Sequence, residues 1–384
     1  MGINVIHRFL EGEDVIRWAR DCSGPALDDI WKEAWLQDGI GSRLNALVGN
    51  LEMAAGAMRY KCDRIVLVAE GAVADMLEAM LFLAPEKDRV KLVRGTLSAG
   101  ELSRVIEDLE QGSAGLIGVA MGEESPSFCA VFATLRKLIA DRYSQEKKDR
   151  LKAIYGRRST YLSEEMERGD MEGFRLPEAY DPGEEFPAST SPLAAGTAAA
   201  CLASSVAMIF PMMVAGINAG AYVRGFREML ASPWWDRDAD QYGLYLGSSV
   251  VGSWESGEDL EEDLLFWQPE LRGVCRWMAA IRRAWGAEAR ALCLPEEAAM
   301  RRPSARATTL FCEEEEADIM LPAFPGVSPE GSLHEMTREA AEALYQSTGG
   351  TMIRLDRMDA EELGRLMAYL QLSFGIAGWL PRNQ

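Results

Sequence analysis

Histidine and cysteine are scarce in this chain, which has two histidines and seven cysteines among 384 residues. The histidines, His7 and His334, are too few to favour a histidine-based metal centre or a serine triad. The cysteines are scattered without a Cys-x-x-Cys pair, as is typical of reduced thiols in a cytoplasmic protein. We therefore predict no metal, no cofactor and a cytoplasmic location.

Positive charge is also in short supply, with 40 lysines and arginines against 60 acidic residues and a net charge of −20. Nucleic-acid phosphates and anionic membrane surfaces are bound through lysine and arginine, so this balance argues against both partners. The shortage is uneven along the chain. Lysine is absent after Lys152, and neither lysine nor arginine occurs between Arg175 and Arg224.

Charge of either sign is missing from residues 186–222, and part of this segment, LASSVAMIFPMMVAGI, is apolar enough to suggest a membrane span. Three prolines, Pro211 among them, and many small residues interrupt the segment. We therefore expect a helix over 199–217 that is buried inside the protein, and no membrane partner.

What the chain does contain is a regular alternation of apolar, strand-length runs with helical patterns. Residues 1–60 have a helical pattern, and the alternation that follows predicts mostly parallel sheets covered on both faces. A segment rich in Pro, Gly, Glu and Ser, 177–192, is expected to connect two α/β halves. Strands are predicted at 63–71, 90–93, 115–120, 152–155, 174–176, 261–267, 289–295, 307–313 and 351–355, and the helices lie between them.

One stretch, GLIGVAMGEESPSFCAVFATLRKLIA, combines a buried strand, a turn and a helix. Gly122 gives the backbone freedom to form the turn, and Ser125 is placed as the N-cap of the helix. Strand-to-helix turns of this kind bind anions in α/β proteins, because unpaired amides and the helix dipole favour negative charge. Here the turn instead carries two acids, Glu123 and Glu124.

These elements, in this order, resemble the glucose-6-phosphate isomerase family, whose fold is two sugar-isomerase (SIS) domains. The resemblance is spread along most of the chain rather than concentrated in one motif. The segments that carry it are DRIVLVAEGAVADMLEAML, LIGVAMGEESPSFCAVFATLRKLI, IFPMMVAGINAGAYVRGFREML, FWQPELRGVCRWMAAIRRAWGAEARALCLP, EEEADIMLP and LDRMDAEELGRLMAYLQLSFGIAGWL.

The resemblance implies an α/β protein with two SIS-like (flavodoxin-like) three-layer αβα domains and mostly parallel sheets. On this basis, residues 46–186 and 187–358 form the two domains. An N-terminal helical arm (1–45) precedes them, and a C-terminal helix (359–384) follows them. Members of the family commonly dimerise, so a homodimer is expected.

The residues that carry the family's chemistry are replaced. The family's Gly-Gly-Ser turn is Glu70-Gly71-Ala72 here, and its phosphate loop Ser-x-Ser-Gly-Thr-Thr aligns with 120–125, where one hydroxyl remains and two acids arrive. The turn with the family's catalytic glutamate reads Gly-Ala-Glu-Ala-Arg, which leaves Glu288 as a displaced candidate base. The family's histidine, lysine and inter-domain arginine have no counterpart.

Two interpretations of the acids stay open. Glu70 follows a strand, where open α/β sheets bind ligands, and together with Glu123 and Glu124 it could line an acidic pocket. Such a pocket would suit a cation, a polyol or an amino sugar better than a phosphate. Alternatively, Glu123 and Glu124 are acids of a helix start that stabilise the helix dipole. Ser125 and Ser127 could donate to a ligand, although capping alone explains Ser125.

We therefore expect an SIS protein that has lost aldose–ketose isomerisation and that binds a small sugar-like ligand or a protein partner. The alternative is a diverged sugar-phosphate isomerase with a remodelled site. The residues expected to contact a ligand lie in the turns after two strands of the first domain: Glu70, Gly71, Gly122, Glu123, Glu124, Ser125 and Ser127.

Overall fold

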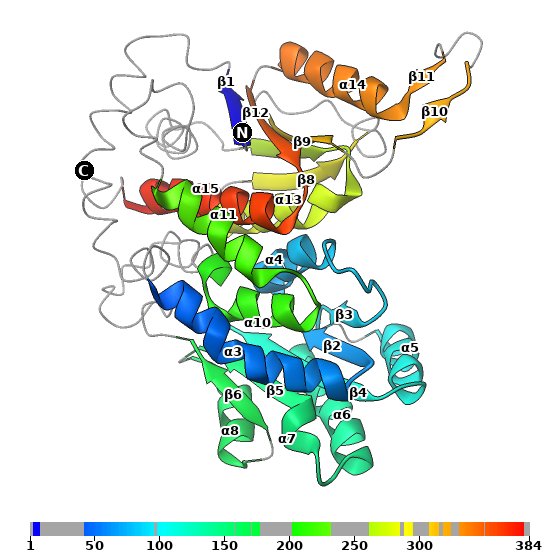
Figure 1. Cartoon of the computed structure of the whole chain (residues 1–384), viewed down its shortest axis with the longest axis vertical. Helices are drawn as coiled ribbons and strands as arrows, with labels where there is room; N and C mark the ends of the chain where they lie inside the picture. Colours follow the sequence, from blue (N-terminus) through cyan, green and yellow to red (C-terminus); the bar gives the residue numbers. More distant parts are fainter. Residues whose placement is uncertain are drawn as a thin grey trace.

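The computed structural model describes residues 3–7, 42–95, 98–156, 158–169, 171–176, 202–231, 261–284, 288–294, 307–314, 318–323, 330–348 and 350–379. These residues form two α/β halves, each built on a five-stranded sheet (Figure 1). The expected fold class, α/β layers with mostly parallel sheets, is confirmed.

The first half holds a fully parallel sheet with the strand order β3-β2-β4-β5-β6. Its strands are β2 (Arg64–Val68), β3 (Val90–Val93), β4 (Ala114–Ala120), β5 (Leu151–Tyr155) and β6 (Glu172–Arg175). Its helices are α3 (Ser42–Lys61), α4 (Gly71–Leu81), α5 (Ala99–Glu110), α6 (Pro126–Arg142), α7 (Lys147–Arg150) and α8 (Tyr161–Glu167).

Both faces of this sheet are covered because alternate residues of a strand point to opposite sides. Val66 and Val68 of β2 share a buried cluster with residues of α5, α6 and α8. Ile65 and Leu67 point the other way, into a cluster with α3, α4 and α10. The near-continuous apolar strands of the sequence therefore reflect burial on both faces.

The second half has the strand order β1-β12-β9-β7-β8, in which only β1 is antiparallel. Its strands are β1 (Ile3–His7), β7 (Glu261–Phe266), β8 (Glu288–Cys293), β9 (Ala307–Glu314) and β12 (Gly350–Arg357), with a separate ladder of β10 (Met320–Leu321) and β11 (Gly331–Ser332). The helices and 3₁₀ turns that follow β6 along the chain are η2 (Leu202–Ser204), α10 (Val206–Val214), α11 (Ala219–Ala231), η3 (Pro269–Leu271), α13 (Arg272–Ala284), α14 (Leu333–Thr348) and α15 (Ala360–Trp379).

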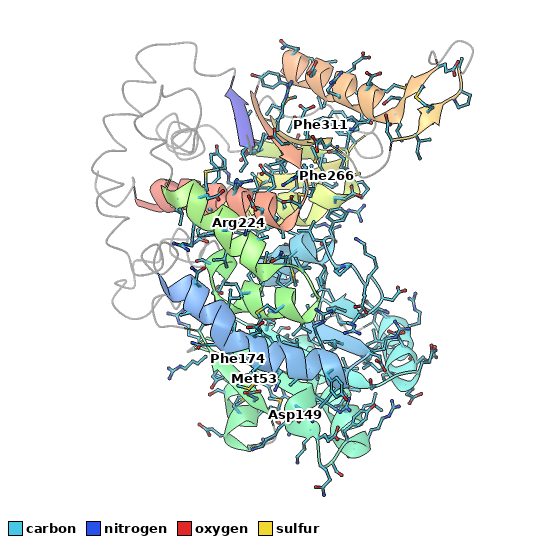
Figure 2. The ribbon with its side chains drawn as sticks, in the orientation of Figure 1. Met53, Asp149, Phe174, Arg224, Phe266 and Phe311 are labelled. Carbon is cyan, nitrogen blue, oxygen red and sulfur yellow. The ribbon has the colours of Figure 1, made fainter. Side chains whose placement is uncertain are left out.

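Helices also cover both faces of the second sheet. Phe311 of β9 (labelled in Figure 2) clusters with Met352 and with Tyr345 of α14. On the other face, Leu310 and Ile353 belong to the large cluster that contains α13 and α15. The outer helix α14 and the inner helices thus sandwich the sheet (Figure 1).

The helical pattern assigned to residues 1–60 was wrong for residues 3–7. These residues form β1, which pairs antiparallel with β12 in the register Ile3–Leu355 to His7–Thr351. The β-branched residues Ile3, Val5 and Ile6 suit such an edge strand. The rest of the helical arm expected over 1–45 lies outside the described residues, apart from the start of α3.

The uncharged segment expected to be a helix over 199–217 is buried, but it is not one continuous helix. In its described part, the 3₁₀ turn η2 precedes α10, which begins only at Val206 after the N-cap Ser205. Ser205 Oγ accepts from the Ala207 amide at 3.1 Å. Among the described helices, none is long and apolar enough to cross a membrane.

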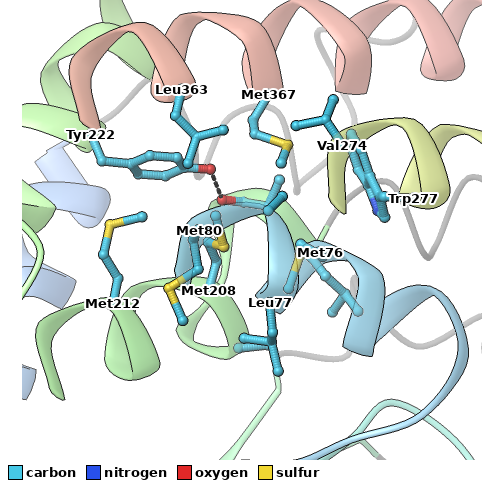
Figure 3. Close-up of a cluster of buried hydrophobic side chains, with 14 of the residues drawn as sticks. Met76, Leu77, Met80, Met208, Met212, Tyr222, Val274, Trp277, Leu363 and Met367 are labelled. Carbon is cyan, nitrogen blue, oxygen red and sulfur yellow. Dashed lines mark hydrogen bonds between the residues drawn. The ribbon is translucent and has the colours of Figure 1, made fainter. Parts of the chain in front are cut away.

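The two halves share one continuous apolar core, which is drawn in Figure 3. Met76 and Met80 of α4, Trp277 of α13, Met367 of α15 and Met208 of α10 all belong to this one cluster. All five side chains have no exposed surface. The described helices between the sheets therefore pack as the interior of one folded unit.

Three glycines allow the helices of this core to touch through their backbones. A Cβ added to Gly225 of α11 would lie 1.9 Å from the carbonyl oxygen of Glu361 in α15. A Cβ added to Gly364 of α15 would lie 2.1 Å from the carbonyl oxygen of Tyr222. At the α4–α13 contact, a Cβ on Gly273 would lie 2.2 Å from the Ala79 nitrogen. Each position excludes any side chain.

We predict that Gly225→Ala lowers the free energy of unfolding by about 1–3 kcal/mol, because the added methyl forces α11 and α15 apart. Urea denaturation followed by circular dichroism measures the change. Gly100→Ala in α5 is the matched control, since a Cβ there meets no atom within 4 Å. An equal effect of the two substitutions would contradict the backbone contact.

Ion pairs reinforce the α11–α15 contact at its edge. Arg224 of α11 donates to Glu361 at 2.9 Å through Nε, and Arg365 also bonds Glu361. The hydrogen bond from Arg224, with help from Arg365, holds the pKa of Glu361 below its ordinary value of 4.5. A depressed carboxylate pKa stabilises the fold above the unfolded-state pKa, and the contribution is lost as pH falls through the folded-state value.

The pH dependence of stability is therefore expected to weaken in Glu361→Gln. Between about pH 6 and about pH 3, the wild type should lose more stability than this variant, because only the wild type loses the Glu361 ion pairs on protonation. Urea midpoints at both pH values measure the difference. Glu123→Gln, which removes an exposed acid elsewhere, should keep the wild-type slope.

Candidate functional site

The carboxyl ends of the first sheet bring four loops together, because all its strands are parallel. Glu70 follows β2, Arg94 follows β3, the 121–125 turn follows β4, and Ser159 lies just beyond β5. Ligands of open α/β sheets dock at this edge, so it is the candidate site.

Glu70 is bonded to Ser125, the last residue of the turn between β4 and α6. Its Oε1 accepts from the Ser125 amide at 2.9 Å, and its Oε2 accepts from the Ser125 hydroxyl at 2.5 Å. Ser125 Oγ in turn accepts from the Phe128 amide at 3.1 Å, which confirms its prediction as the N-cap of α6. Ser127 Oγ lies 2.9 Å from Ser125 Oγ. Since the Ser125 proton is directed to Glu70, Ser127 is the donor in this pair.

The Glu124 carboxylate binds the start of a different helix, α8. It is only 7% exposed, and its carboxylate accepts from the amides of Thr160, Tyr161 and Leu162 at 3.0, 3.2 and 3.1 Å. The Ser159 hydroxyl donates to the same carboxylate. These donors form the start of α8, whose first amides have no partner within the helix. Glu124 therefore acts as a side-chain anion at the α8 N-terminus.

The acids that could line an acidic pocket have separate partners within the protein. Glu70 and Glu124 are bonded to the starts of two different helices, and Glu123 is exposed. The interpretation of helix-stabilising acids holds for Glu124, but the stabilised helix is α8 rather than the adjoining α6. The site thus presents hydroxyls and one partly used carboxylate.

The glycine that needs its conformational freedom is Gly71 rather than Gly122. Gly71 has φ +57°, in the left-handed region, at the point where the chain turns from β2 into α4. Gly122 has no positive φ, and a Cβ there would meet no atom within 4 Å. The expectation that Gly122 provides the freedom for its turn was therefore wrong.

Arg94 is a cation at this edge that sequence reasoning missed. Its Nη1 donates to Asp75 at 2.7 Å, and its Nη2 bonds Glu78. Arg276 of α13 reaches Glu78 at 3.3 Å, so the cluster links the two halves. Burial raises the pKa of Asp75, and the hydrogen bond from Arg94 opposes this effect. The rule that ligand groups follow parallel strands would have identified Arg94, the residue directly after β3.

Glu288, the candidate base, is exposed and stands at the amino end of β8, in register with Glu261. In the described part of the chain, no hydrogen bond or ion pair joins it to Glu70 or Glu124. Its role in catalysis stays a prediction. Also among the described residues, no group of three His, Cys, Asp or Glu side chains could hold a metal ion.

We predict that Glu124→Ala lowers the free energy of unfolding by about 2–4 kcal/mol, because it leaves the buried Leu162 amide and Ser159 hydroxyl, and two more exposed amides, without their acceptor. Glu123→Ala is the matched control, and its effect should stay within about 0.5 kcal/mol because the side chain is exposed. Denaturant unfolding of both variants measures the difference. Similar losses in the two would contradict the capping role of Glu124.

Comparison with known proteins gives matches to solved structures alone. No protein-family model matches the chain, and no curated protein matches it. The structure resembles that of a hypothetical protein from Thermus thermophilus, with a TM-score of 0.77, 14% identity, and 98% of this chain and 94% of that chain covered.

Two further structures carry names of sugar-phosphate enzymes. A glucose-6-phosphate isomerase from Chlamydia trachomatis matches with a TM-score of 0.63 and 11% identity over 87% of this chain and 68% of its own. A putative phosphosugar isomerase from Silicibacter pomeroyi matches with a TM-score of 0.52 and 11% identity over 91% and 97%. At these identities, the likeness establishes the fold.

Proposed function

We propose that this protein binds a small, sugar-like ligand without a phosphate at the carboxyl edge of its first sheet, and that it does not interconvert aldose and ketose phosphates. The observation that carries the proposal is the pair of bonds from Ser125 to Glu70. They occupy the amide and the hydroxyl that begin α6, where an anion would otherwise be held.

Electrostatics supports the exclusion of phosphate. A carboxylate and a phosphate charge about 4 Å apart repel by about 1 kcal/mol in water and about 4 kcal/mol near a protein surface. The helix dipole stabilises an anion at an exposed helix N-terminus by only about 0.3–1 kcal/mol, which does not offset this repulsion. Arg94, the nearby cation, already pairs with two carboxylates.

The hydroxyl groups support a neutral or amino sugar as the ligand. Ser125 and Ser127 form a chain of hydroxyls that ends on the Glu70 carboxylate. A carboxylate has more acceptor positions than Ser125 uses, so Glu70 can also accept from a sugar hydroxyl or an ammonium group.

The alternative is a diverged sugar-phosphate isomerase. It is favoured by the structural likeness to the Chlamydia trachomatis glucose-6-phosphate isomerase, which covers 87% of this chain. Isomerisation needs a base near the reacting carbons and cationic stabilisation of the intermediate. The candidate base Glu288 is exposed and lies at the amino end of β8, whereas ligands of parallel sheets bind at the carboxyl ends of the strands. This position supports the non-catalytic proposal.

Two measurements on the purified protein test the proposal. We expect glucose, glucosamine or sorbitol to raise the melting temperature, and glucose 6-phosphate to have little effect, because only a ligand that binds the native state stabilises it. We also expect no turnover of glucose 6-phosphate in a coupled isomerase assay. Turnover above that of Glu288→Gln would establish the isomerase instead.

Removal of the Glu70 carboxylate should admit phosphate. We predict that Glu70→Ala strengthens glucose 6-phosphate binding about 5-fold or more, since about 1 kcal/mol of repulsion disappears and both Ser125 donors are freed. The gain should be larger at low ionic strength. Isothermal titration calorimetry measures the dissociation constants.

Two further variants test whether phosphate is excluded by the charge of Glu70 or by its hydrogen bonds with Ser125. Glu70→Gln removes the charge but keeps an acceptor for Ser125, so it should give a smaller gain than Glu70→Ala. Glu123→Gln removes an exposed acid from the turn after β4 and should change little. If none of the three variants binds phosphate better than the wild type, Glu70 is not what excludes it.

A further inference from the structure

A cavity of about 420 Å³ lies on the outer side of the second half, between α14 and β12. Helix α14 lies outside the second sheet, at the end of the molecule away from the first sheet (Figure 1). The volume is within the range of about 300–1,000 Å³ that is typical of small-molecule sites. The residues that line the cavity come from the helix and from one position of the strand: Glu339, Glu342, Ala343, Tyr345, Gln346 and Arg354.

The helix wall of this cavity is one flank of α14. Four of its lining residues follow the spacing i, i+3, i+4 and i+7, so they lie on the same side of the helix. Tyr345, which is only 8% exposed, packs in a buried cluster with Phe311 and Met352 and fixes the helix on the sheet. The wall is therefore held in place by the core beneath it.

Arg354 provides the positive charge of the cavity. It lies two residues after Met352 on β12, so its side chain is on the α14 side of the sheet. Its Nη2 donates to Glu342 Oε1 at 2.8 Å, and its Nε lies 3.6 Å from a Glu313 oxygen. Within the described part of the chain, Nη1 donates to no protein atom. One edge of the guanidinium thus remains available to a ligand.

The negative charges of the cavity also have unused positions. The Arg354 bond engages only Oε1 of Glu342. Among the described residues, neither Oε2 of Glu342 nor the exposed carboxylate of Glu339 has a hydrogen bond or an ion pair. An anion alone would meet the two carboxylates, and a simple cation would meet Arg354. A ligand that carries both charges satisfies both kinds of group.

We propose that this cavity binds a free α-amino acid, with its carboxylate on Arg354 Nη1 and its ammonium group on Glu342 and Glu339. The Arg354–Glu342 pair and the two charges of the amino acid then form a ring of alternating sign, in which each charge has opposite charges on both sides. A neutral sugar can also hydrogen-bond here, but hydrogen bonds between charged groups are about twice as strong as those between neutral groups. The small side chain of Ala343 leaves room for the side chain of the ligand.

Isothermal titration calorimetry on the full chain tests this proposal with glycine, leucine, lysine, glutamate and phenylalanine as probes. We expect saturable binding of at least one of them, with a dissociation constant of about 5 mM or lower. Two analogues of leucine carry one charge each: 3-methylbutylamine lacks the carboxylate, and 4-methylpentanoate lacks the ammonium group. Both should bind at least about 10-fold more weakly than leucine, because each loses one charged pair.

The outcomes of this titration are decisive. If none of the five amino acids binds saturably at concentrations up to about 20 mM, the cavity is not an amino-acid site. If an analogue with one charge, or glucose, binds as tightly as leucine, recognition of the paired charges is refuted.

Substitutions assign the binding to this cavity. Arg354→Gln should weaken amino-acid binding at least about 10-fold, because the partner of the carboxylate is removed. Arg64→Gln is the matched control, since Arg64 has a similarly exposed side chain and pairs with Asp108 in the first half. It should bind like the wild type.

A second pair of variants leaves every charge in place. Ala343→Trp fills the cavity and should abolish binding, whereas Ala340→Trp adds the same side chain at an exposed position of α14 that does not line the cavity. Circular dichroism verifies that all four variants are folded. Unchanged binding in both Arg354→Gln and Ala343→Trp would overturn the assignment. None of these residues belongs to the proposed ligand site of the first sheet, so the failure of one proposal leaves the other intact.

Discussion

Direct backbone contact between helices is the constraint on which the rest of this structure depends. Gly225 and Gly364 bring α11 against α15, and Gly273 brings α13 against α4. At such short distances the apolar side chains around the contacts, Trp277 and Met80 among them, merge into one core that serves both sheets. Because packed interiors resist deformation, the two halves behave as one body through these helices.

The polar side chains of the candidate site lie outside this core, at the carboxyl end of the first sheet. Two carboxylates at this end of the sheet accept hydrogen bonds from the protein itself: Glu124 binds the start of α8, and Glu70 binds the start of α6. Both contacts replace water or an external anion at amides that a helix cannot satisfy itself. The site is therefore shaped by the needs of the fold as much as by any ligand.

The sequence predicts those features that depend on near neighbours. The strands β2 and β4, the helices after them and the cap Ser125 follow from periodicity and from contacts three residues apart. Features that depend on residues far apart in the sequence cannot be predicted in this way. Ser125 lies 55 residues from Glu70, and the pairing of Ile3 with Leu355 spans almost the whole chain.

The glycines also divide into those whose role follows from local sequence and those whose role depends on distant residues. The sequence indicates that a turn needs a glycine, but the φ angle that requires it falls at Gly71, whereas Gly122 adopts an ordinary conformation. At Gly225 and Gly364 the requirement comes from another helix altogether. No local pattern distinguishes a glycine kept for its own backbone from one kept for the approach of a neighbour.

The carboxylates of Glu124 and Glu70 have different roles in the protein. Every partner of Glu124 belongs to the segment that begins α8, and its side chain is buried, so its removal affects the fold first. Glu70 binds Ser125, the N-cap of the 17-residue helix α6, which starts at the sheet edge, where anions are held in α/β proteins. Of the two carboxylates, Glu124 therefore contributes more to the stability of the fold, whereas the proposed preference for an unphosphorylated ligand rests on Glu70.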